Sequence, residues 1–177
     1  VVTLLERTEL TWLQVEALPE AVVTAGLEWH HLPVRDVSVP TAAFERRWRY
    51  AGARLRQRLR AGERVLVHCR GGLGRAGIVA ARLRVECGEA PAAAIEQVRA
   101  VRPGAIETAE QEAWVLAQLP VDGLQTPTLS LGIASYPSDA ARPDEMIRLA
   151  DAALYAAKQA GRNVTVRYSP LNNMLPE

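Results

Sequence analysis

Seven residues, Cys69 to Arg75, have the types and spacing needed to hold a phosphate group and to attack it. A thiol stands at one end of this segment, a guanidinium at the other, and three glycines between them. Glycines let successive backbone N–H groups curl inward, and the N-terminus of a following helix adds its dipole. Because such surroundings also favour a cysteine thiolate, the segment predicts a nucleophile beside an anion cradle.

Arg75 is predicted to clamp the phosphate, since its planar fork can bind two phosphoryl oxygens and follow them into the transition state. His68 is expected to order the loop through hydrogen bonds. A metal-binding role for it is disfavoured, because the other histidines, His30 and His31, are neighbours on one expected strand. The predicted phosphate-binding residues are Arg70, Gly71, Gly72, Leu73, Gly74 and Arg75.

Periodicity, caps and breakers indicate the elements that position this loop. Expected strands cover 1–5, 27–32 and 64–67, and expected helices cover 9–18, 42–61, 78–87, 91–101 and 108–119. After a linker at 120–127, a strand is expected at 128–134, a helix at 144–160 and a strand at 163–168. The predicted class is α/β, with a central, mostly parallel sheet between helices and a small C-terminal β-α-β unit.

Two other functions fit parts of the sequence. Gly72, Gly74 and Gly77 also match a dinucleotide-binding fingerprint, but a further helix follows where that fingerprint needs a strand, so this interpretation is disfavoured. The helix expected at 42–61 carries seven arginines, which indicate either a solvated surface or a site for acidic partners.

His68-Cys69-x5-Arg75-x-Gly77 resembles the signature of the protein tyrosine and dual-specificity phosphatases. Segment 32–40 resembles the general-acid loop of their kinase-associated branch, and segment 98–111 resembles a later conserved block of that branch. The resemblance covers about residues 1–119, which are expected to form one domain.

The resemblance implies a mechanism without a cofactor. Cys69 would form a phosphocysteine, and Asp36 would first protonate the leaving oxygen and then activate water. Gln111 would position that water, or would only close a helix cap with Thr108. Phosphorylated protein would be the substrate, with phosphotyrosine the leading class and phosphoserine or phosphothreonine additional ones.

One position departs from the family pattern, which usually has Ser or Thr where this chain has Ala76. The change removes a hydroxyl that would stabilise the thiolate, so breakdown of the phosphoenzyme is expected to be slower. An inactive phosphate-binding module is therefore the alternative to an enzyme.

The C-terminal segments 128–137 and 150–163 resemble the last third of a diguanylate cyclase (GGDEF) domain. The Gly-Gly-Asp/Glu-Glu-Phe signature is missing from the sequence, so cyclase activity is excluded. In that family the positions of Lys158 and Arg162 contact nucleotide phosphates, which leaves a GTP or cyclic-di-GMP sensor as an alternative. The unit at 128–168, followed by a tail at 169–177, is too small to stand alone and should dock on the phosphatase or on a second copy in a homodimer.

Composition adds few constraints. A net charge of +1 gives no argument for nucleic-acid or membrane binding, and no apolar run is long enough to span a bilayer. The first residues lack the layout of a signal peptide, so a cytoplasmic location is expected. With two cysteines, reduced thiols are expected, and Cys87 is interpreted as a core residue or, less favoured, as a disulfide partner of Cys69.

Overall fold

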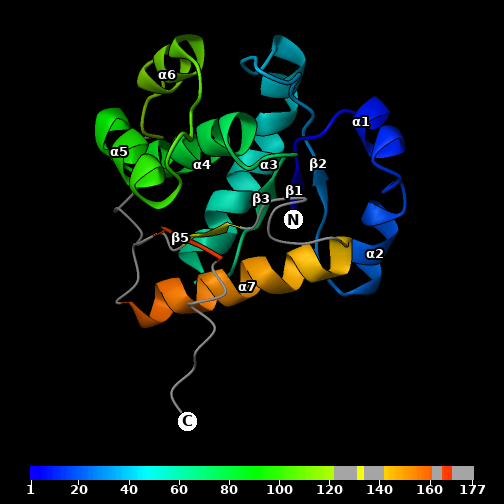
Figure 1. The fold of residues 1–177 in the computed structure, drawn as a ribbon. Coiled ribbons are helices and arrows are strands. Elements are labelled where there is room, and N and C mark those ends of the chain that lie inside the picture. The colour runs from blue at the N-terminus through cyan, green and yellow to red at the C-terminus, as the bar shows by residue number, and fades with distance from the viewer. Residues whose placement is uncertain (122–130, 134–141, 161–164, 169–177) are drawn as a thin grey trace.

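The computed structural model describes residues 1–121, 131–133, 142–160 and 165–168. Its larger sheet contains β1 (Val2–Thr3), β2 (His30–His31) and β3 (Val67–His68), all parallel and in the order β2-β1-β3. The helices that precede the C-terminal unit are α1 (Arg7–Trp12), α2 (Leu18–Thr24), α3 (Ala42–Arg60), α4 (Gly74–Glu86), α5 (Pro91–Val101) and α6 (Ala109–Leu116). This arrangement confirms the predicted α/β class and its parallel sheet (Figure 1).

The sheet separates two hydrophobic clusters, and the alternation of side chains along β1 shows this directly. Val2 and Leu4 belong to the main core, which also contains residues of α3 to α6. Leu5 belongs to a second cluster, formed chiefly by α1 and α2. Figure 1 shows α1 and α2 on one side of the sheet and α3 to α6 on the other.

The predicted helix at 9–18 is wrong, because two short helices occupy this region. α1 ends at Trp12, Gln14 has a left-handed φ of 56°, and α2 begins at Leu18 with Pro19 in its first turn. A left-handed residue interrupts a helix, whereas proline is well tolerated at the start of one. The apolar pattern of 9–18 therefore belongs to a helix, a turn and the beginning of a second helix.

Other boundaries differ less. Thr41 caps α3, as predicted, by accepting a hydrogen bond from the Phe44 N–H at 3.4 Å, and Gly62 follows the helix with a φ of +77°. All three strands of the larger sheet are shorter than predicted. α4 begins at Gly74 and not at residue 78, so the end of the glycine-rich segment is already helical.

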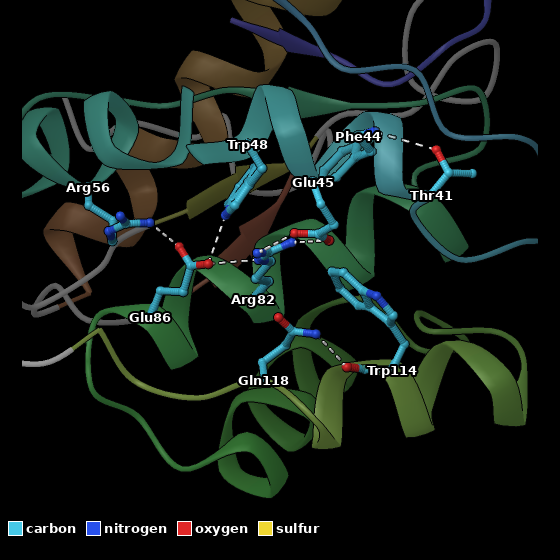
Figure 2. Close-up of polar contacts among 9 residues, drawn as sticks. All are labelled: Thr41, Phe44, Glu45, Trp48, Arg56, Arg82, Glu86, Trp114 and Gln118. Carbon is cyan, nitrogen blue, oxygen red and sulfur yellow. Dashed lines mark hydrogen bonds and ion pairs between the residues drawn. The ribbon is translucent and has the colours of Figure 1, made fainter. Parts of the chain in front are cut away.

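A network of buried charges fixes α4 against α3 and α6 (Figure 2). Arg82 lies 4.7 Å from the ring centroid of Trp48 and 5.2 Å from that of Trp114. Its guanidinium donates to both carboxylate oxygens of Glu45, at 2.7 and 2.9 Å, and to Glu86 at 2.7 Å. Removing one partner from a buried ion pair is strongly destabilising, because it leaves an uncompensated charge. The network therefore holds α4, which follows the glycine-rich loop, in place.

The C-terminal unit packs on the rest of the chain. It contains β4 (Leu131–Ile133) and β5 (Thr165–Arg167), which are parallel, and α7 (Pro143–Gln159). Leu149 and Ala150 of α7 pack with Leu66, while Ile147 packs on the cluster of α1 and α2. An ion pair joins Arg64 and Asp151. Of the two arrangements expected for this unit, the structure thus shows docking on the phosphatase-like part.

None of the helices in the described ranges is both long enough and apolar enough to cross a membrane.

Candidate active site

The glycine-rich loop leads from the end of β3 to the start of α4. Cys69 follows β3 directly and is 5% exposed. Its sulfur accepts a hydrogen bond from the backbone N–H of Gly72, at 3.2 Å, so the loop curls back on the thiol. Gly72 has a φ of +66°, a conformation that residues with a Cβ rarely adopt.

Segment 102–111 supports the outer side of this loop. Arg102 donates to the Gly71 carbonyl at 2.9 Å, and the Leu73 carbonyl accepts from the Ile106 N–H at 3.4 Å. A Cβ on Gly74 would lie 2.8 Å from the amide nitrogen of the fully buried Gln111, so this position has no room for a side chain. The later block that resembles the kinase-associated branch thus contacts the loop that carries the signature.

Arg75 lies in the first turn of α4, and its side chain is 1% exposed. Its guanidinium binds both carboxylate oxygens of Glu9, at 2.6 and 2.9 Å. It also donates to the Val34 carbonyl at 3.2 Å and lies 3.0 Å from a carboxylate oxygen of Asp36. Burial alone would lower the pKa of Arg75, but hydrogen bonding to Glu9 and the nearby negative charges raise it. The guanidinium is therefore fully charged and held in one orientation.

Glu9 is a site residue that the sequence did not reveal. Although burial alone would raise the pKa of Glu9, the hydrogen bond from Arg75 lowers it, so the carboxylate is ionised. Glu9 also accepts from the Glu6 N–H at 2.8 Å, as an acidic residue in the first turn of a helix commonly does. That ordinary capping position gave no signal of the contact with a residue 66 positions away.

We expect Glu9→Gln to lower kcat/KM for p-nitrophenyl phosphate about 10- to 100-fold, because a small misplacement of Arg75 weakens transition-state binding. Glu9 is a positioning residue, so Glu9→Asp should recover part of the loss. Glu16→Gln removes a carboxylate at an exposed position nearby and should leave kcat/KM unchanged. Equal rates for Glu9→Gln and wild type would show that the ion pair does not orient Arg75.

Asp36 lies beside Arg75 in the loop that follows β2, and its role as the acid stays a prediction. Its side chain is 56% exposed and can therefore meet a leaving group or water. The next residue, Val37, has a φ of +53°, which is unusual for a β-branched side chain and marks a strained turn. The Ser38 hydroxyl, which donates to the Arg35 carbonyl at 2.8 Å, closes this turn.

Gln111 joins the acid loop to α6. Its amide N–H₂ donates to the Ser38 carbonyl at 3.3 Å, and its amide oxygen accepts from the Glu107 N–H at 3.0 Å. Its own backbone N–H donates to the Thr108 hydroxyl at 3.1 Å, which is one half of the predicted capping box. The returning bond reaches Glu107 and not Thr108. Gln111 is fully buried here, and its role toward water stays a prediction.

His68 is buried at the end of β3, opposite Thr3 of β1. Its Nε2 lies 2.8 Å from the Thr3 hydroxyl, which also accepts from the Trp29 indole N–H at 2.9 Å. Burial lowers the pKa of His68 to about 4. The imidazole is therefore neutral at physiological pH and links β3 to β1 just before Cys69.

This pKa predicts a loss of stability in acid. Between the unfolded pKa of His68, near 6.5, and the folded value of about 4, the unfolded chain binds a proton that the folded chain does not. Stability therefore falls as the pH drops through this window, by about 3 kcal/mol for this group. Urea unfolding of wild type and His68→Asn at several pH values measures the effect. The variant should show a flatter pH dependence, and parallel curves would contradict the assignment.

The remaining candidate residues are Cys87, Lys158, Arg162 and Arg70. Cys87 follows the C-terminal end of α4, so a helix of about 20 Å separates it from the phosphate loop. The alternative disulfide with Cys69 is therefore wrong, because bridged cysteines need Cα atoms within about 7 Å. Lys158 donates to the Gly62 carbonyl at 3.5 Å, and Arg162 lies outside the described residues. Arg70 is exposed and lies 4.5 Å above the ring of Trp12.

A cysteine and a buried arginine thus lie in one loop, with an aspartate beside the arginine. The chain matches the family model "Swiss Army Knife protein, DSP-PTPase phosphatase domain" over residues 1–115, and it belongs to that family. Residues 94–164 match the model of the diguanylate cyclase GGDEF domain. The second match begins within α5, earlier in the chain than the resemblance noted in the sequence.

Two phosphatases are among the solved structures that are similar to this one. A kinase-associated phosphatase with its catalytic-site cysteine replaced by serine is 30% identical, with a TM-score of 0.57, and the match covers 64% of each chain. Tk-PTP in its active form is 34% identical, with a TM-score of 0.54, and the match covers 65% of this chain and 73% of that one. The chain thus spans about two thirds of the length of these phosphatases. No curated protein matches it significantly.

Proposed function

We propose that the chain hydrolyses phosphomonoesters on proteins through a phosphocysteine intermediate, with phosphotyrosine as the leading substrate class. The single observation that carries the proposal is the position of Arg75. Its guanidinium lies 3.0 Å from the candidate acid Asp36, and its backbone belongs to the first turn of α4, the helix that follows the Cys69 loop. This position supports a site in which Cys69 is the nucleophile, Arg75 the clamp and Asp36 the acid.

In the first step, the Cys69 thiolate attacks phosphorus and the ester P–O bond breaks. The leaving oxygen takes a proton from Asp36, and Arg75 stabilises the charge on the equatorial oxygens. In the second step, water gives a proton to the Asp36 carboxylate and attacks phosphorus. The S–P bond then breaks, which releases phosphate and restores the thiolate.

The alanine at position 76 supports a second candidate function, that of a phosphatase with slow turnover. It is buried at 5% exposure beside Arg75 and brings no hydroxyl to the sulfur that leaves in the second step. We infer that breakdown of the phosphocysteine limits the rate, and a phosphate-binding module that barely turns over is the extreme case.

The remaining parts of the proposal concern the setting. We infer that the C-terminal unit makes no cyclic dinucleotide, because the sequence lacks the cyclase signature. A catalytic thiolate suits a reducing compartment, which favours the cytoplasm. A nucleotide sensor through Lys158 would require that side chain to leave the Gly62 carbonyl.

Hydrolysis of p-nitrophenyl phosphate by the full chain tests the proposal. Release of p-nitrophenol should be inhibited by vanadate, which mimics the transition state, and should not depend on added metal or on chelator. Absence of release, together with absence of vanadate binding by calorimetry, would refute both the enzyme and the phosphate-binding module.

The role of Asp36 is tested through the leaving group. Asp36→Asn should lower kcat/KM for phenyl phosphate by about 100-fold, because a poor leaving group needs the proton. With p-nitrophenyl phosphate, whose leaving group needs little protonation, the loss should be only a fewfold. Equal losses on the two esters would exclude Asp36 as the acid.

A further inference from the structure

A cavity of about 620 Å³ lies where α7 meets the phosphatase domain, away from the phosphate loop. Its wall combines residues of the segment before β2, of α3, of the segment before β3 and of α7. The apolar side chains include Leu27, Leu55 and Leu66 from the phosphatase domain, and Ile147 and Leu154 from α7. A volume of a few hundred Å³ and a largely apolar wall with a few polar groups are typical of small-molecule sites.

The cavity wall contains three carboxylates and three arginines, and Arg148 is the arginine that takes no part in their ion pairs. The acidic residues of the wall are paired with its own arginines, Glu28 and Glu63 with Arg58 and Asp151 with Arg64. Arg148 also lines the cavity, and it forms no ion pair with any side chain that the structure describes. A largely apolar cavity with a guanidinium that is free of ion pairs to the described side chains is complementary to a ligand with an apolar body and one anionic group.

We propose that this cavity is a binding site for a small amphipathic anion, such as an aromatic or aliphatic body bearing a carboxylate, sulfonate or phosphate. Leu27, which is 41% exposed, would cover the apolar body at the cavity mouth. Arg148 would bind the anionic group. The cavity lies between the two parts of the chain, so an occupant contacts both.

The packing around Ile147 connects the cavity to the catalytic site. Ile147 lines the cavity and also packs on the cluster that contains Leu10 of α1. Leu10 directly follows Glu9, whose carboxylate orients Arg75. An occupant that shifts α7 therefore changes the support of α1 and alters kcat/KM. This regulatory part of the inference rests on the proposed function, whereas the binding part does not.

Titration of the full chain with 1-anilinonaphthalene-8-sulfonate, an apolar aromatic body with one sulfonate, tests the binding site by fluorescence. Wild type should bind one molecule per chain. Arg148→Glu and Leu27→Asp should each weaken binding about tenfold or more, through lost attraction to the sulfonate and added repulsion. Arg60→Glu and Leu119→Asp make the same changes at exposed positions outside the cavity and should alter the affinity less than about twofold.

Two further results complete the test. Binding that survives both cavity substitutions, or that the control substitutions weaken equally, would overturn the site. The same probe should change kcat/KM for p-nitrophenyl phosphate in wild type and not in Arg148→Glu, and an unchanged kcat/KM at saturation would overturn the coupling. Fluorescence reports binding without turnover, so a failure of the phosphatase chemistry would appear separately, as absent hydrolysis without probe.

Discussion

Replacing Cys69 by serine is expected to lower kcat for p-nitrophenyl phosphate by about 10⁴-fold or more, because removal of a nucleophile eliminates the covalent route. A serine hydroxyl is not ionised near neutral pH. The group next to it would be the Gly72 backbone N–H, which is a donor, and no side chain of the loop could act as a base. Steady-state kinetics of the two proteins measure the loss.

Binding separates a chemical defect from a folding defect in this variant. Cys69→Ser keeps Arg75 and the loop amides, so calorimetry should still detect phosphate. Cys87→Ser changes the other buried cysteine, at the far end of α4, and should retain activity. Cysteine-independent hydrolysis by Cys69→Ser would place the reaction elsewhere.

Replacing Arg75 by lysine is expected to lower kcat/KM by about 10³-fold, although the positive charge is kept. Lysine offers a point charge, so it can neither bind two phosphoryl oxygens in one plane nor keep the paired bonds to Glu9 at 2.6 and 2.9 Å. Arg75→Lys would therefore lose both the fixed orientation of the side chain and its two-point contact with phosphate.

The control for Arg75→Lys is Arg70→Lys, the same substitution at an exposed position of the same loop. This change removes the stacking on Trp12 but leaves the buried clamp, so kcat/KM should fall less than tenfold. If both substitutions cost the same, charge alone would account for the contribution of Arg75.

The parts of the site that are contiguous in sequence could be predicted, because strand, glycines and helix lie within 20 residues and constrain one another. Cys69 and Arg75 are predicted in this way, and the family resemblance adds Asp36, which lies beside Arg75 in the structure. Glu9 could not be predicted, since its partner lies 66 positions away and its local role is that of an ordinary helix cap.

In the fold, too, features set by neighbouring residues could be predicted, whereas features set by contacts between distant residues could not. The ends of α3 were predicted from Thr41 and Gly62, whose capping chemistry is local. The break between α1 and α2 depends on a left-handed glutamine, a residue type that carries no turn signal. The docking surface of α7 depends on Leu66 and on the cluster of α1 and α2, which the amphipathic pattern of α7 does not identify.

The most direct test of the account is rapid quenching of the full chain in acid during turnover of p-nitrophenyl phosphate, followed by mass spectrometry of its peptides. The account predicts one phosphoryl group on the peptide that contains Cys69, absent from Cys69→Ser, and accumulating because Ala76 slows its hydrolysis. Turnover without any phosphorylated cysteine, or with the phosphoryl group on another residue, would contradict it.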